Sequence, residues 1–152
     1  MAEEVAGLTF ESEEWTRVLK KLKDKWKDIK NRKEFGAIVA IAGFKDILSH
    51  FDDELGPTGK WQERSEAYKI YAHKQGKTKI LQFSGTLRKS FTPSSPKFRS
   101  NTSGIILYSK VPYARAHDEG LGKMPERKFM WLSKDAIDSI IKQTLKWLSE
   151  GI

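Results

Sequence analysis

EFGAIVAIAGFKDILSHFDDE, residues 34–54, is the stretch that decides the fold. Its second half keeps the helical spacing of apolar residues, with Phe44, Ile47 and Phe51 on one face. Its first half is apolar on nearly every side and is rich in small residues: Gly36, Ala37, Ala40, Ala42 and Gly43. A helix that is apolar all round is normally buried, and small residues let another backbone approach closely. The stretch therefore predicts a central core helix, ended by Gly56-Pro57.

The residues before this stretch predict an amphipathic helix with a basic outer face. Its apolar stripe has helical spacing and consists of Trp15, Val18, Leu19, Leu22, Trp26 and Ile29. Ser12 is the expected N-cap, and Glu13 and Glu14 suit the positive end of the helix dipole. Residues 1–14 carry five acids and no Lys or Arg, whereas residues 15–34 carry nine bases against three acids. We expect this helix to lay its stripe on its own domain or on a neighbouring subunit.

The residues after the central helix predict short helices, strands and a closing helix. We expect a helix over 63–73, a helical turn capped by Ser84, a short helix over 113–119 and an amphipathic helix over 134–148 with Ser133 as N-cap. Between them, residues 90–99 and 104–109 predict an antiparallel hairpin joined through 100–103, and residues 127–131 a third strand. Helices, then strands, then a helix indicate an α+β fold.

Length and composition indicate one domain without disulfides. A chain of 152 residues fits a single domain over 1–152, which we divide into an N-terminal part, 1–33, and an α+β body, 34–152. The N-terminal part is a candidate oligomer contact. The absence of cysteine excludes disulfides, zinc–thiolate sites and thiol nucleophiles. The acidic start predicts no secretory signal, and the ten-residue apolar run 35–44 is shorter than the ~20 residues of a membrane-spanning helix.

The candidate catalytic and metal-binding groups form no coherent site in the sequence. His50 precedes three acids, 52–54, at a helix end that we expect to be solvated. His117-Asp118-Glu119 is the most suggestive group for acid–base chemistry, although a structural hydrogen bond is the favoured interpretation of His117. The segment 56–60 lacks the first glycine and the Ser or Thr of a phosphate-binding loop, so it is predicted to be a turn. The sequence therefore predicts no enzyme, no cofactor and no metal.

Basic residues are the better candidates for a binding function. Residues 60–99 carry ten bases against two acids. Such clusters neutralise phosphates in a salt-dependent manner, but no established nucleic-acid motif is present. Non-specific nucleic-acid binding is therefore the alternative function. Its expected contacts are Lys20, Lys21, Lys23, Lys27, Arg88 and Lys89.

Four groups of residues, in order along residues ~56–148, resemble the Mu-like gpG, or phage virion morphogenesis, family. The first is a turn with Pro57, Gly59 and Trp61, and the second joins residues 79–82 to Ser84, Gly85, Leu87 and Ser90. The third is similar to a Tyr-Ala-x-x-His-x-x-Gly segment, with Tyr113, Ala114, His117, Glu119 and Gly120. The fourth is similar to a Pro-x-Arg-x-Phe-x-x-Leu-Ser segment, with Pro125, Arg127, Phe129, Leu132 and Ser133.

The resemblance implies a small antiparallel sheet packed against a long helix. It also implies a structural role in tail completion or head–tail joining, as a homo-oligomeric ring beside other neck or tail proteins. Such a protein assembles in the host bacterial cytoplasm and ends in the virion neck or tail. Under it, twelve residues have structural roles: Trp61, Ser84, Gly85, Leu87, Ser90, Tyr113, Ala114, His117, Gly120, Pro125, Arg127 and Phe129. We call these the motif positions.

Overall fold

The computed structural model describes residues 2–5 and 8–150. Its helices are α1 (Ser12–Trp26), α2 (Ile29–Asp53), α3 (Glu66–Lys74), α4 (Thr86–Lys89), α5 (Ala114–Glu119) and α6 (Lys134–Glu150). Its strands are β1 (Ala2–Val5), β2 (Leu8–Glu11), β3 (Leu55–Gly56), β4 (Gly59–Lys60), β5 (Phe98–Asn101) and β6 (Gly104–Leu107). The strands pair only with their neighbours in sequence, as antiparallel hairpins. The α+β prediction is confirmed.

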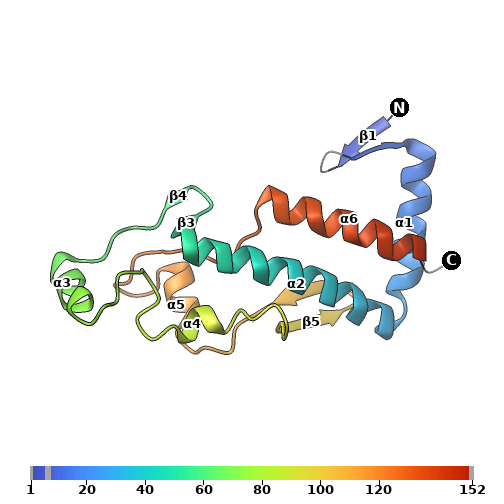
Figure 1. Cartoon of the computed structure of the whole chain (residues 1–152). Helices are drawn as coiled ribbons and strands as arrows, with labels where there is room; N and C mark the ends of the chain where they lie inside the picture. Colours follow the sequence, from blue (N-terminus) through green and yellow to red (C-terminus); the bar gives the residue numbers. More distant parts are fainter. Residues whose placement is uncertain (1, 6–7, 151–152) are drawn as a thin grey trace.

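The long helix α2 is the axis of the molecule, with α6 along one side and the β5–β6 hairpin along another (Figure 1). The hairpin approaches α2 at its glycines. A Cβ atom at Gly36 would overlap the ring of Phe98, and one at Gly43 would lie 2.6 Å from Leu107 Cδ1. The expected close approach of another element to the small residues of α2, and the small sheet packed against a long helix, are both confirmed.

The core lies along the C-terminal half of α2. Phe44, Ile47 and Phe51 meet Phe91 and Phe129, which come from distant parts of the chain, and all five side chains are essentially inaccessible to solvent. The rings of Phe51 and Phe129 have centroids 5.1 Å apart, and those of Phe44 and Phe91 are 5.2 Å apart. This aromatic core holds the segments that form the cavity described below.

The boundary between the first two helices differs from the prediction. The chain breaks after Trp26, and α2 begins at Ile29, five residues before the expected start. The cause is Asp28, whose carboxylate accepts the backbone N–H of Lys30 at 2.7 Å and caps a new helix. Ile29 is 61% exposed, so the predicted stripe does not continue through it. The N-cap of α1 is Glu11 rather than Ser12.

The predicted strands are longer than the observed ones, and one is wrong. The first strand of the hairpin covers 98–101 instead of 90–99, and the second covers 104–107. The turn is tight because the side chain of Asn101 accepts the N–H groups of Ser103 and Gly104. Residues 127–131 form no strand. The β1–β2 hairpin, in contrast, was not predicted.

None of the helices within residues 2–5 and 8–150 is long and apolar enough to cross a bilayer.

Candidate functional site

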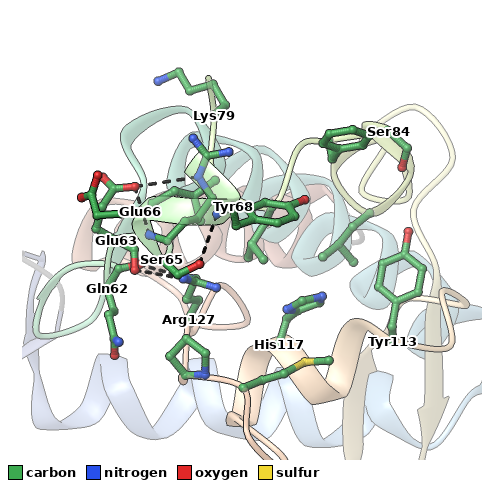
Figure 2. A pocket seen from close by; sticks show the side chains of 17 residues that line it. Gln62, Glu63, Ser65, Glu66, Tyr68, Lys79, Ser84, Tyr113, His117 and Arg127 are labelled. Atoms are coloured by element: carbon green, nitrogen blue, oxygen red, sulfur yellow. Dashed lines mark hydrogen bonds and ion pairs between the residues drawn. The ribbon is translucent and has the colours of Figure 1, made fainter. Parts of the chain in front are cut away.

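A cavity of about 1080 Å³ lies beyond the C-terminal end of α2. Three segments form it: residues 62–68 at the start of α3, residues 79–87, and residues 113–127 from α5 onward. Six motif positions line it: Ser84, Leu87, Tyr113, His117, Pro125 and Arg127. In Figure 2, Tyr68 and Ser84 face His117, Tyr113 and Arg127 across the opening. Half of the motif positions, separated by up to forty-three residues (84 to 127), thus share one site.

Two buried arginines connect the walls of this cavity. Arg127 donates from Nε to the carbonyl oxygen of Gln62 at 2.9 Å, and its backbone N–H donates to the carbonyl oxygen of His117 at 2.9 Å. Arg64 donates through its two terminal nitrogens to the carbonyl oxygens of Lys77 and Thr78. Guanidinium groups that donate to carbonyl oxygens of distant segments hold together loops that have no sheet to join. Arg64 was not singled out from the sequence, because one arginine among ten bases carries no local signal.

Burial changes the titration of two cavity residues. Desolvation lowers the pKa of Arg127, an effect opposed by the nearby Glu63 carboxylate and reinforced by the Arg64 cation. Desolvation also lowers the pKa of His117, and the positive charge of Arg127 lowers it further. The pKa of Glu63 is lowered chiefly because its carboxylate accepts the backbone N–H of Arg64. His117 is therefore mainly a neutral imidazole at pH 7, edge-on to the Tyr113 ring and close to the Arg127 cation.

The His117-Asp118-Glu119 group does not converge on one point. The Asp118 carboxylate points away from the cavity and accepts the backbone N–H groups of Phe129 and Met130 at 2.9 and 2.8 Å. Glu119 pairs with Arg115 at the surface. His117 lies edge-on to Tyr113, and its Nδ1 atom is buried without a hydrogen-bond partner among the described residues. The geometry gives His117 no carboxylate to orient it as a general base. Asp118 also explains why 127–131 is not a strand, because its carboxylate takes the N–H groups that a ladder would use.

His50 was expected at a solvated helix end, and this expectation is wrong. Its ring is 3% exposed and stacks on Trp131, with centroids 3.8 Å apart. Its Nε2 atom lies 3.1 Å from the Trp131 carbonyl oxygen and 3.2 Å from Asp46 Oδ2. The segment before α6 covers this face of α2, which the local sequence does not reveal. No group of three or more His or acidic residues suited to a metal occurs within the part of the chain that the structure describes.

The other motif positions lie in the core or at backbone turns. Ala114 and Phe129 are buried, and Trp61 donates from Nε1 to the carbonyl oxygen of Lys128 at 2.9 Å. The Ser90 hydroxyl lies 2.6 Å from the Leu87 carbonyl oxygen and 2.8 Å from the Ser109 hydroxyl. Gly85 and Gly120 both have positive φ, at the start of α4 and the end of α5. These positions do not line the cavity, but they hold in place the segments that form its walls.

Replacing Gly120 by alanine is expected to destabilise the protein by about 2–4 kcal/mol. Gly120 has φ +68°, and a Cβ atom there would lie 2.6 Å from the backbone nitrogen of Glu126. Gly122 provides the matched control: its φ is +64°, but nothing lies within 4 Å of a built Cβ. Gly122→Ala should cost only the left-handed backbone penalty, about 1 kcal/mol. Urea unfolding of both variants measures the difference, and equal costs would contradict the close approach at Gly120.

The lowered pKa of His117 predicts a component of stability that depends on pH. In the unfolded chain His117 takes up a proton near the ordinary histidine pKa of about 6.5, whereas burial in the folded cavity disfavours the protonated ring. The free energy of unfolding should therefore fall as the pH drops below 6.5, with a slope of at most about 1.4 kcal/mol per pH unit. His117→Gln should lose this component. Parallel pH profiles of the two proteins between pH 8 and 5, measured by urea unfolding, would contradict the burial of a neutral imidazole.

The six predicted polyanion contacts do not form one surface. Lys20, Lys21 and Lys23 are exposed on α1, and Lys27 is exposed directly after its last residue, 3.3 Å from Asp24. Arg88 and Lys89 belong to α4, near the other end of α2 (Figure 1). Arg88 is paired with the Asp52 carboxylate, at 2.9 Å from its Nη2 atom. Any polyanion surface on α1 is therefore separate from one on α4.

The fold and the motif positions agree with a known family of assembly proteins. The chain belongs to the phage virion morphogenesis family, which it matches over residues 10–149. It is also similar to the Mu-like prophage FluMu G protein 1 of Haemophilus influenzae, with 35% identity over 102 residues, or 66% of this chain and 68% of the relative. No solved structure matches. The predicted family is confirmed, and with it a role in phage virion morphogenesis.

Proposed function

We propose that the protein acts in tail completion or head–tail joining, as a non-enzymatic, homo-oligomeric ring that contacts other neck or tail proteins. Family membership supports the general role. The proposal also places the protein in the host bacterial cytoplasm during assembly and in the virion neck or tail afterwards. The observation that supports an oligomer is that the apolar stripe of α1 is only partly covered within one subunit.

Helix α1 has the marked amphipathic pattern expected from the sequence, yet none of its residues is buried. At its C-terminal end, Trp26 packs edge-on against Phe35 and donates to the carbonyl oxygen of Thr102 at 3.0 Å. Leu19, in the middle of the stripe, is 46% exposed. An amphipathic helix gains stability by covering its apolar face, and a second subunit supplies the missing cover.

Light scattering of the full chain tests this proposal. The expected mass is a multiple of the 17.5 kDa subunit that decreases on dilution. Leu19→Lys should shift the equilibrium toward monomer, whereas Ile106→Lys, at a 57% exposed position on β6, should not. A wild-type protein that stays monomeric, with or without candidate neck proteins, and never enters particles would exclude the ring.

The exposed lysines of α1 favour non-specific DNA binding as a second function. Lysines 20, 21 and 23 lie on the helix and lysine 27 directly follows it, and all four are exposed. Each phosphate contact releases a counterion, so binding should weaken steeply with salt. We expect Lys20→Glu/Lys21→Glu to reduce both the affinity and the salt slope, measured by fluorescence anisotropy with a random duplex. Affinity that is independent of salt would reject this function.

A further inference from the structure

Three exposed aromatic rings cluster at the end of the molecule farthest from α1. Tyr71 and Phe83 are stacked with centroids 6.0 Å apart and planes within 6°, and Tyr68 lies 6.1 Å from Tyr71 and 6.4 Å from Phe83. Their exposed fractions are 43% for Tyr68, 54% for Tyr71 and 37% for Phe83. We call these three residues the aromatic tip. Exposed aromatic clusters of this kind are typical of protein–protein contacts, because rigid rings bury area at low entropic cost.

The aromatic tip is surrounded by positive charge and opens into the cavity. Lys77 Nζ lies 6.0 Å from the centre of the Phe83 ring, and the Arg64 guanidinium lies 5.9 Å from that of Tyr68. Residues 60–83 carry six bases against two acids. Tyr68 and Phe83 also line the cavity of about 1080 Å³. The surface therefore suits an acidic partner that carries apolar side chains.

The N-terminal segment of the same chain has this chemistry. Residues 2–14 contain five glutamates and no base, together with Val5, Leu8 and Phe10. Residues 2–5 and 8–11 form the β1–β2 hairpin, which carries three of these glutamates, projects from the body and contacts α1, where the other two glutamates lie (Figure 1). A two-stranded hairpin is marginally stable by itself, so this one gains from a second surface. Charge and composition thus match it to the aromatic tip.

The hairpin of one chain cannot reach its own aromatic tip. The hairpin and α1 lie at the N-terminal end of α2, and α3 lies beyond the other end (Figure 1). Helix α2 has 25 residues and so separates the two ends by about 37 Å. The two surfaces can meet only between different copies. A contact between opposite ends is head-to-tail, and such contacts close into rings when the rotation between subunits allows it.

We propose that the β1–β2 hairpin of one copy docks on the aromatic tip and the adjoining cavity of the next copy. This proposal rests on the proposed ring, and it identifies the two surfaces through which neighbouring subunits of that ring would bind. Because α1 directly follows the hairpin, the subunit that binds the hairpin would also cover the apolar stripe of α1. Stacked nucleic-acid bases are the competing occupant of exposed aromatic rings, and the experiments below separate the two.

Cysteine cross-linking tests the contact directly, because the chain contains no cysteine. Thr9→Cys in β2 and Gln75→Cys, one residue after α3, place single thiols at the two proposed surfaces while keeping their charges. A mixture of the two variants should form a disulfide-linked dimer, and the doubly substituted chain should form a ladder. Gln143→Cys on α6 is the matched control and should not react with Thr9→Cys. Equal reaction at both sites, or none, overturns the proposal.

Charge reversal tests whether the contact drives assembly. Glu3→Lys/Glu4→Lys and Lys74→Glu/Lys77→Glu should each weaken self-association at least tenfold in sedimentation experiments, and all four changes combined should restore part of it. A mixture of the two double variants should also regain association, because each contact then joins either two wild-type surfaces or two reversed surfaces. If both double variants assemble normally, the proposed hairpin contact is wrong, but the proposed ring is not affected. If the wild-type protein is monomeric, the hairpin contact and the ring are both wrong. If Tyr71→Ala/Phe83→Ala abolishes DNA binding and leaves assembly intact, the tip is a nucleic-acid surface and the proposal is overturned.

Discussion

Replacing Asp118 by alanine is expected to lower the free energy of unfolding by about 3–5 kcal/mol. The side chain is almost fully buried, and its Oδ1 atom accepts two backbone N–H groups, from Phe129 at 2.9 Å and Met130 at 2.8 Å. Both donors lie beside the core and would be left without a partner. A hydrogen bond to a charged acceptor contributes about 1.5–3 kcal/mol, and here two are lost together. Urea unfolding monitored by tryptophan fluorescence measures the loss.

Two substitutions calibrate this result. Asp118→Asn keeps an acceptor oxygen of the same shape and should cost less than half as much as alanine. Glu119→Ala removes the neighbouring carboxylate, whose partner is the exposed Arg115, and should cost at most about 0.5 kcal/mol. If Asp118→Ala unfolds at the wild-type urea concentration, residues 127–131 are held by something other than this carboxylate.

The elements that depend on local periodicity were predictable from the sequence. Helix α6 begins at Lys134 as expected, and the Ser133 hydroxyl accepts the N–H of Ala136 as the predicted N-cap. The body of α2 was also predicted, because its apolar pattern is long and its small residues need a close neighbour. Such helices can be predicted because the apolar pattern of one helix is enough to show that it forms and which face it buries.

The elements that depend on a single side chain or on distant contacts were not predictable. The apolar spacing runs through residues 15–29 as if they formed one helix, but Asp28 caps a new helix and so separates α1 from α2. Residues 127–131 have a β-like composition, but their N–H groups are taken by a carboxylate from α5. His50 is polar and follows a helical pattern, yet the loop before α6 covers it. In each case tertiary structure overrides a local propensity.

The candidate site was predictable only in part. The resemblance identified six of the residues that line the cavity, without indicating that they meet. Arg64, Tyr68 and Phe83 were missed as site residues, because their sequence neighbours show no periodicity that would place them together. The only sequence signal for this surface is the joint excess of bases and aromatic residues over 60–83. That signal gives composition and no geometry.

Phe51→Ala should be among the most destabilising single changes in the protein, costing about 4–5 kcal/mol. The side chain is fully buried, and its ring lies 5.1 Å from that of Phe129, 5.5 Å from Trp61 and 6.0 Å from Phe91. Truncation leaves a cavity between three rings that come from separate segments, so none of them can move in alone. A loss of this size approaches the whole stability of a small domain, about 5–15 kcal/mol.

The effect of Phe51→Ala on the cavity distinguishes a residue that packs the core from one that makes contacts in assembly. Trp61 and Phe129 flank residues 62–64 and Arg127, so a looser core should widen the cavity before the chain unfolds. Phe51→Leu should cost about 1–2 kcal/mol and keep assembly, whereas Phe83→Ala should cost less than 1 kcal/mol because its ring is 37% exposed. Paired urea unfolding and sedimentation then distinguish the two kinds of aromatic residue. Phe51 should affect assembly only through stability, and Phe83 should affect assembly at unchanged stability; a Phe83→Ala protein that loses both would place this ring in the core.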